Sequence, residues 1–178
     1  NNLSIIILLL NFGFESAITY AHSKKQFSYS YLFFLALLWS FLSTTIFTVI
    51  YFFTAKTGVV QFNSLSYYII FYILSILLTS FASALFYSSN NHIIPNLLPS
   101  IANVSLILVI FFSTEYWKFQ YPFLLKTYLI ASIITGLIMI LYASKNVNLK
   151  NTIKFTLPKE LLIYSFKFFL ANASITLL

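Results

Sequence analysis

Residues 57–114 read TGVVQFNSLSYYIIFYILSILLTSFASALFYSSNNHIIPNLLPSIANVSLILVIFFST and contain no Asp, Glu, Lys or Arg. The hydrocarbon core of a bilayer is roughly 30 Å thick, and a helix needs about 20 apolar residues to cross it. This stretch holds two apolar segments of about that length, at 65–88 and 95–113, separated by the polar sequence SSNNH at 88–92. It therefore predicts two membrane-spanning helices.

The rest of the chain repeats this pattern. Hydrophobic residues make up 60% of the sequence and charged residues 7%, whereas about a quarter of the residues in a soluble domain are charged. The charges lie mostly between long apolar runs, which predict further helices at about 3–22, 29–53, 121–144 and 158 to the end. A membrane β-barrel would instead need alternating ten-residue strands. We predict an all-α polytopic transmembrane helix bundle.

Composition excludes several classes of function. All ten positive charges are lysines that flank apolar helices, so we expect anionic membrane lipid as their partner and no nucleic acid. The chain has no Cys, which rules out disulfides and thiolate metal sites. His22 and His92 lie near different loops with no acid at ligand spacing. No acid pair, triad or Gly-rich phosphate loop is present, so we predict no metal, no cofactor and no enzymatic activity.

The lysines also predict an orientation. The first, third and fifth loops contain six lysines together, whereas the second and fourth contain two. By the positive-inside rule, the loops near Lys24, His92 and Lys145–Lys159 are cytoplasmic and the chain starts outside. One further helix before Asn1 is then expected. The basic stretch 145–157 is predicted to join a first lobe, 1–144, to a second that begins at 158–178, or simply to contact anionic lipid.

Glu15 is the one acid well inside a predicted span. It lies seven residues before His22, about 10 Å from that helix end. A charge near the bilayer centre costs about 2.5–3.5 kcal/mol, so Glu15 should face the bundle interior, water or a partner. Asn11, Thr19 and His22 share its face, within an arc of about 80°. Either Glu15 hydrogen-bonds a neighbouring helix as a packing residue, or it lines a functional cavity. The opposite face is a stripe of small residues, Gly13, Ala17 and Ala21.

Other helices contain small polar residues at four-residue spacing, which usually indicates close helix packing and otherwise a water-lined pathway. The rows are Ser40, Thr44 and Thr48; Ser75, Thr79 and Ser83; and Ser132 with Gly136.

Lys167 lies about nine residues into the last predicted helix, on the same face as Glu160 and Tyr164. Its side chain either extends to the membrane interface or faces an anion.

Two segments resemble a known family. Residues 11–25, NFGFESAITYAHSKK, resemble the second helix of the O-antigen-type oligosaccharide flippases of the multidrug/oligosaccharidyl-lipid/polysaccharide exporter superfamily, and residues 161–172, LLIYSFKFFLAN, resemble the start of their seventh helix. That family usually has proline where this chain has Lys167, and commonly arginine at the position of Thr19. The resemblance places the whole chain at helices two to seven, within a transporter of twelve or more helices.

The resemblance implies two six-helix lobes around a cavity that opens alternately to either side of the bacterial inner membrane. The substrate would be a polyprenyl-pyrophosphate-linked oligosaccharide for polysaccharide biosynthesis, with H⁺ or Na⁺ as coupling ion. The candidate cavity or entrance residues are Asn11, Glu15, Thr19, Lys24, Lys25 and Lys167. Alternatives are a multidrug/cation antiporter of the same superfamily, a lipid-linked glycosyltransferase and a noncatalytic membrane assembly subunit.

Overall fold

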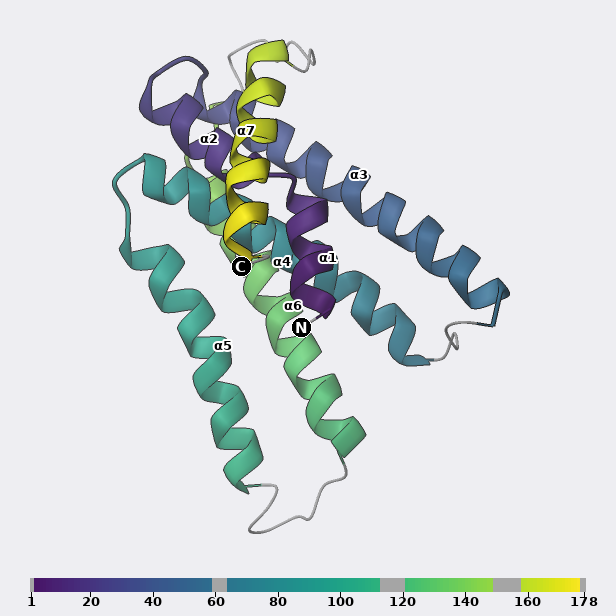
Figure 1. Ribbon diagram of the computed structural model, residues 1–178. Coiled ribbons are helices and arrows are strands. Elements are labelled where there is room, and N and C mark those ends of the chain that lie inside the picture. Colours follow the sequence, from purple (N-terminus) through teal and green to yellow (C-terminus); the bar gives the residue numbers. More distant parts are fainter. Residues whose placement is uncertain (1, 59–63, 113–120, 149–157, 177–178) are drawn as a thin grey trace.

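The computed structural model describes residues 2–58, 64–112, 121–148 and 158–176, and every regular element in these ranges is an α-helix. The all-α prediction is therefore confirmed. The helices, shown in Figure 1, are α1 (Asn2–Asn11), α2 (Phe14–Ser23), α3 (Tyr29–Lys56), α4 (Ser64–Ser88), α5 (Ile93–Phe112), α6 (Tyr121–Ser144) and α7 (Lys159–Thr176).

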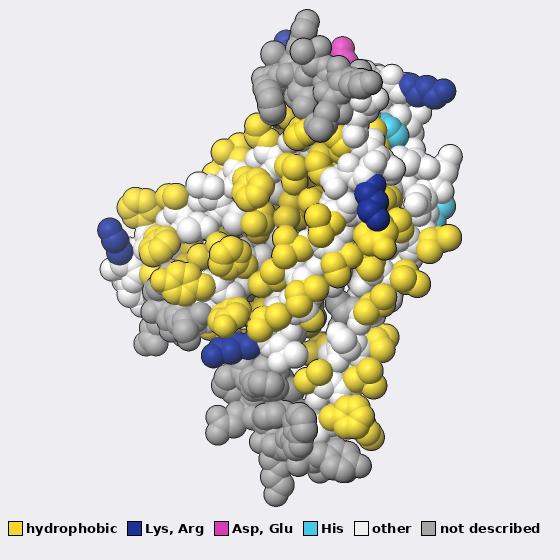
Figure 2. All heavy atoms as spheres, turned by 180° about the vertical axis from the view of Figure 1, so that it is seen from behind, with side chains coloured by type: hydrophobic (Ala, Val, Ile, Leu, Met, Phe, Trp, Pro, Cys, Tyr) yellow, Lys and Arg dark blue, Asp and Glu magenta, His cyan; other side chains and the backbone are white. Residues whose placement is uncertain are grey.

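Apolar length identifies the chain as a polytopic membrane protein. Among the described residues, α3, α4, α5 and α6 are long and apolar enough to cross a membrane, and α1 with α2 adds a fifth span if the bent pair is counted as one. The sequence predicted six. The sixth corresponds to α7, which contains Lys159, Glu160 and Lys167 within its 18 residues. Figure 2 shows hydrophobic side chains covering most of the described surface on one side of the bundle.

The first predicted helix is broken, which corrects the continuous span expected at 3–22. Phe12 and Gly13 have φ angles of 50° and 69°, and α1 and α2 meet at a bend of 43°. The break deprives the Leu10 carbonyl of a helical partner, since Phe14 begins a new helix. Trp39 Nε1 and Ser43 Oγ donate to that carbonyl instead, at 3.2 and 3.1 Å. Backbone groups in lipid need such partners, and α3 provides them here.

The backbone of α7 lies against the break. A Cβ atom at Gly13 would overlap the carbonyl oxygen of Ser165 and lie 2.5 Å from the backbone nitrogen of Phe169. The Phe12 ring stacks on Phe169 with centroids 5.0 Å apart. Gly13 is therefore a close-packing position, and the other small residues of the stripe, Ala17 and Ala21, are fully buried. The two-lobe division stays a prediction, and most of the proposed inter-lobe loop, at 149–157, lies outside the described residues.

Helix α4 forms the centre of the bundle and packs against α2, α3 and α6. Its buried side chains lie along its whole length, among them Ile73, Leu77, Phe81 and Leu85. The contact with α6 is close because Ser75 meets Gly136 across it. Ser75 Oγ donates to the Ser132 carbonyl at 2.5 Å. The packing interpretation is thus confirmed for Ser75 and Gly136.

Substituting Gly136→Ala is expected to destabilise this crossing. The added Cβ would lie 2.8 Å from the Ser75 carbonyl oxygen and 3.0 Å from its Cα, so one helix has to move. Overpacking of this kind lowers the free energy of unfolding by about 1–3 kcal/mol. Thermal unfolding of the purified protein in detergent measures the loss. The control is Leu141→Ala on the same helix, where the side chain is 65% exposed; equal losses would contradict the close crossing.

The loops alternate between two ends of the bundle. The turns at 24–28 and 89–92 lie toward the same end as the start of α7, whereas α3 and α5 finish toward the other (Figure 1). The described parts of the loops predicted to be cytoplasmic, the two turns and the start of α7, thus lie toward one end. Which membrane face that end occupies stays a prediction.

Candidate functional site

Glu15 lies in the first turn of α2, directly after the break. Its carboxyl group accepts hydrogen bonds from side chains of α1 and α4. Asn11 at the end of α1 donates from Nδ2 to Glu15 Oε2 at 3.1 Å. Ser80 on α4 donates from Oγ to the same oxygen at 2.9 Å. The Glu15 backbone N–H in turn donates to Asn11 Oδ1 at 3.2 Å. The acid is therefore hydrogen-bonded inside the bundle, as its cost in a membrane requires.

Thr19 extends this network by one helical turn. Its hydroxyl oxygen is 3.1 Å from the Glu15 carbonyl and 3.5 Å from the Ala84 carbonyl on α4. The structure thus brings together three of the predicted residues, Asn11, Glu15 and Thr19. His22 is separate from them and packs edge-on against the Tyr29 ring, at 5.8 Å between centroids.

Beside Glu15 is a cavity of about 320 Å³, here called the polar chamber. It lies between α2, α4, α5 and α6, and its volume is at the lower end of the range for ligand pockets. Its lining residues are Glu15, Ile76, Thr79, Ser80, Ser83, Tyr87, Pro99, Asn103, Tyr128, Ser132 and Thr135.

A second cavity of about 260 Å³, the side cavity, lies on the other side of Glu15 toward α1 and α7. Asn11 and Asn172 line it, but Tyr128 and Thr135 do not. Glu15 and Ser80 line both cavities. The hydrogen bond between them therefore stands at the boundary of two polar spaces.

The polar chamber offers several hydrogen-bond acceptors beside the amide of Asn103. The hydroxyls of Thr79, Ser132 and Thr135 each donate to a carbonyl of their own helix, at 2.8, 3.0 and 2.9 Å. Ser80 donates to Glu15. A hydroxyl that has used its proton still offers oxygen lone pairs. Together with the carboxyl group of Glu15, these oxygens suit a ligand that donates hydrogen bonds, such as a sugar hydroxyl, or a cation.

None of the lysines proposed as site residues lines either cavity. Lys24 and Lys25 follow the end of α2 and are exposed, and Lys167 is exposed on α7. Helical periodicity explains Lys167, because the buried face of α7 contains Leu161 and Ser165. The lysines expected to face an anionic group are therefore outside both cavities. An entrance role for these lysines stays a prediction.

Several lining residues were not singled out from the sequence. Ser80, the partner of Glu15, is one position away from the row of Thr79 and Ser83, and nothing local distinguishes it from other serines. Tyr128 and Thr135 come from α6, and Asn103 comes from α5. Only the crossing of α2 over α4 brings Ser80 to the acid. The row of Thr79 and Ser83 does indicate this site. Both side chains line the polar chamber, which agrees with the alternative that such rows line a water-filled pathway.

Removing the Ser80 hydroxyl is expected to weaken the contact between α2 and α4. Interhelical hydrogen bonds in membranes contribute about 0.6 kcal/mol on average and up to about 1.7 kcal/mol. Because the acceptor is a carboxyl group, we expect Ser80→Ala to lie in the upper part of that range, measured by thermal unfolding. Ser88→Ala is the matched control, since Ser88 Oγ donates to Leu85 of its own helix. A loss no larger than that of Ser88→Ala would contradict the role assigned to Ser80.

The fold and this site define a polytopic membrane protein with an acidic, hydroxyl-lined chamber inside its helix bundle. Comparison with protein-family models, curated proteins and solved structures finds no match for this chain. Its functional interpretation therefore depends on the residues and geometry of the chamber.

Proposed function

We propose that this protein is a transporter that flips a polyprenyl-pyrophosphate-linked oligosaccharide across the bacterial cytoplasmic membrane for polysaccharide biosynthesis. The observation that supports the proposal is the polar chamber within the bundle, which offers several acceptor oxygens and has Glu15 at its edge. Sugar hydroxyls donate hydrogen bonds to such oxygens, and a chamber between helices lets them leave water without losing these bonds. The resemblance of residues 11–25 and 161–172 to O-antigen-type flippases supports the same class of substrate.

Glu15 has two roles in this proposal. Its carboxyl group accepts hydrogen bonds from sugar hydroxyls, and it also binds the coupling ion, H⁺ or Na⁺, as intramembrane acids do in many transporters. Its bonds to Asn11 and Ser80 hold it between the two cavities. We assign no catalytic step to the chamber, because Glu15 is the single carboxyl group among its described lining residues and sugar transfer typically uses carboxylates that hold a metal or act as a base.

Deleting the gene tests the proposal. The host is expected to lose most of its surface polysaccharide and to accumulate the lipid-linked oligosaccharide on the inner face of its membrane. Expression of the full-length protein should reverse both effects. Unchanged surface polysaccharide in the deletion strain, with no accumulated precursor, would overturn the proposal.

The second candidate is a multidrug/cation antiporter. The composition of the chamber favours it specifically, because a carboxyl group and the aromatic rings of Tyr87 and Tyr128 all attract organic cations. This function predicts that the deletion strain becomes sensitive to cationic drugs while its surface polysaccharide stays unchanged. Drug susceptibility profiles of the deletion and complemented strains therefore separate the two functions.

A further inference from the structure

The carboxyl group of Glu15 has one oxygen left for a ligand. Asn11 Nδ2 and Ser80 Oγ both donate to Oε2, at 3.1 and 2.9 Å. Oε1 accepts no hydrogen bond from the described residues, although Glu15 lines the polar chamber. No lysine or histidine belongs to the described lining. The chamber therefore contains an acid without a basic partner, which is costly inside a membrane unless a group of opposite charge joins it.

The hydroxyl groups around this acid act mostly as acceptors toward a ligand. Those of Thr79, Ser132 and Thr135 donate to carbonyls of their own helices. The hydroxyl of Tyr87 donates to Asn96 Oδ1 at 2.6 Å. Each of these oxygens keeps lone pairs for a ligand, and an ammonium group has three N–H donors and no acceptor. Beside a carboxyl group, such oxygens therefore match an ammonium ion better than a neutral or an anionic group.

Asn103 indicates what the ammonium group is attached to. Its side-chain amide adds both donors and an acceptor to the lining of the chamber. Hydroxyl groups also donate and accept, so they are the natural partners of an amide. The chamber volume of about 320 Å³ suits one small ring better than a drug of several rings. A sugar ring with one amino group combines these features.

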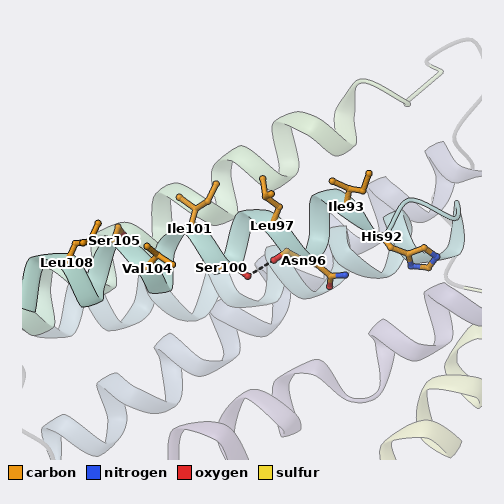
Figure 3. A pocket seen from close by; sticks show the side chains of 9 residues that line it. All are labelled: His92, Ile93, Asn96, Leu97, Ser100, Ile101, Val104, Ser105 and Leu108. Atoms are coloured by element: carbon orange, nitrogen blue, oxygen red, sulfur yellow. Dashed lines mark hydrogen bonds between the residues drawn. The ribbon is translucent and has the colours of Figure 1, made fainter.

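The two sides of α5 differ in the partners that they offer. Figure 3 shows the outer side, where Ile93, Leu97 and Ile101 form an apolar row. Pro99 and Asn103 line the chamber instead. At about 100° per residue, positions 99 and 101 point in roughly opposite directions. A charged ligand therefore finds hydrogen-bond partners on the chamber side of α5 and not along its apolar row.

We propose that the polar chamber binds a sugar that carries a free amino group, with the ammonium group on Glu15 Oε1. This inference rests on the proposed function and adds the chemical class of sugar that the chamber selects. Hydroxyl oxygens of the lining accept the other N–H donors, and the amide of Asn103 bonds to hydroxyls of the sugar ring. Sugars with a carboxylate are rejected, because Glu15 repels them and no described lysine in the lining compensates.

Binding of matched hexoses to the purified full-length protein tests this selectivity. Glucosamine and glucose differ only in the amino group, and glucuronate adds a carboxylate to the glucose ring. Affinity is measured from the rise of the unfolding midpoint with sugar concentration, at a pH at which the amine is protonated. We expect glucosamine to bind about tenfold more tightly than glucose, and glucuronate to give no stabilisation. Equal affinity for glucosamine and glucose, or tighter binding of glucuronate, would overturn the proposal.

The Glu15→Gln variant assigns the selectivity to the carboxyl group. We expect it to bind glucosamine about tenfold more weakly, while its affinity for glucose changes by less than about threefold. Glu160→Gln is the control, because Glu160 is exposed on α7 and lines neither cavity. That variant should bind both sugars like the unaltered protein. A preference for glucosamine that survives in Glu15→Gln would show that the ammonium group is bound elsewhere.

Thr135→Val provides a second test if Glu15→Gln does not fold. It removes one acceptor oxygen of the chamber at nearly constant volume, and the lost hydroxyl donates only within its own helix. We expect glucosamine to bind about threefold more weakly and glucose to be less affected. An unchanged ratio of the two affinities would contradict the site.

Two smaller cations separate an amino sugar from other sources of positive charge. Ethanolamine has an ammonium group without a sugar ring, and tetramethylammonium has the charge without an N–H donor. We expect each to bind at least about tenfold more weakly than glucosamine. If ethanolamine bound as tightly, the ring would contribute nothing. If tetramethylammonium did, the chamber would be a general cation site. Either result would overturn the proposal.

This binding assay does not depend on transport. If deletion of the gene leaves surface polysaccharide unchanged while glucosamine still binds through Glu15, the proposed function is wrong and the amino-sugar site stands. If export depends on the protein but glucosamine binds no better than glucose, the amino-sugar inference is wrong and the proposed function stands.

Discussion

Replacing Glu15 by Gln is expected to reduce export of surface polysaccharide about tenfold to a hundredfold while the protein remains folded. Gln keeps a side-chain oxygen that can accept from Asn11 and Ser80, so the network around the bend is preserved. It replaces the carboxyl group by an amide that cannot exchange a proton, and a loss of about 1.5–3 kcal/mol in binding corresponds to roughly a tenfold to hundredfold change. It also removes the carboxyl group that we propose binds a proton or sodium ion.

The measurement is surface polysaccharide in a deletion strain that expresses each variant at the same level. Glu160→Gln is the matched control, because Glu160 is exposed in the first turn of α7 and lines neither cavity. We expect that variant to export normally. Normal export by Glu15→Gln at normal protein levels would show that Glu15 is a packing residue, which is the alternative interpretation of this acid.

Substituting Gly13→Ala is expected to have the largest effect on folding, a loss of about 2–5 kcal/mol in the free energy of unfolding. Two causes add. The φ angle of 69° is unfavourable for any residue with a Cβ, and that Cβ would overlap the backbone of α7 at Ser165 and Phe169. Because backbone atoms cannot turn aside as a side chain does, α7 has to separate from the break. The folded yield in size-exclusion chromatography and the thermal unfolding midpoint measure the loss.

Gly58→Ala separates the two causes. Gly58 has a similar φ of 78°, but nothing in the described part of the chain lies within 4 Å of a Cβ added there. We expect this variant to lose about 1–2 kcal/mol, from the backbone alone. The difference between the two variants then measures the contact of Gly13 with α7. Equal losses would mean that a Cβ at position 13 does not clash with the backbone of α7 in solution.

The helices were predictable because their signal is local. An apolar run long enough to cross a membrane predicts a helix whatever surrounds it, so α3 to α6 could be recognised from composition and charge gaps. That Glu15 would have polar partners was predictable for the same reason, since an acid deep in an apolar segment needs them. The break at Gly13 was not predictable, because a lone glycine in a helical pattern is usually tolerated. The need for glycine at this position follows from the contact with the backbone of α7, which only the tertiary structure shows.

The sequence by itself determined that this chain is an all-α membrane protein and that Glu15 must have polar partners, because the cost of charge and unbonded backbone in lipid acts on each segment separately. The tertiary structure alone decided which partners those are. The crossing of α2 over α4 brought Ser80 to Glu15, and α5 and α6 added Asn103, Tyr128 and Thr135 to the polar chamber. It also left Lys24, Lys25 and Lys167 outside the chamber. Helix crossings depend on small residues meeting across sequence separations that no local pattern encodes.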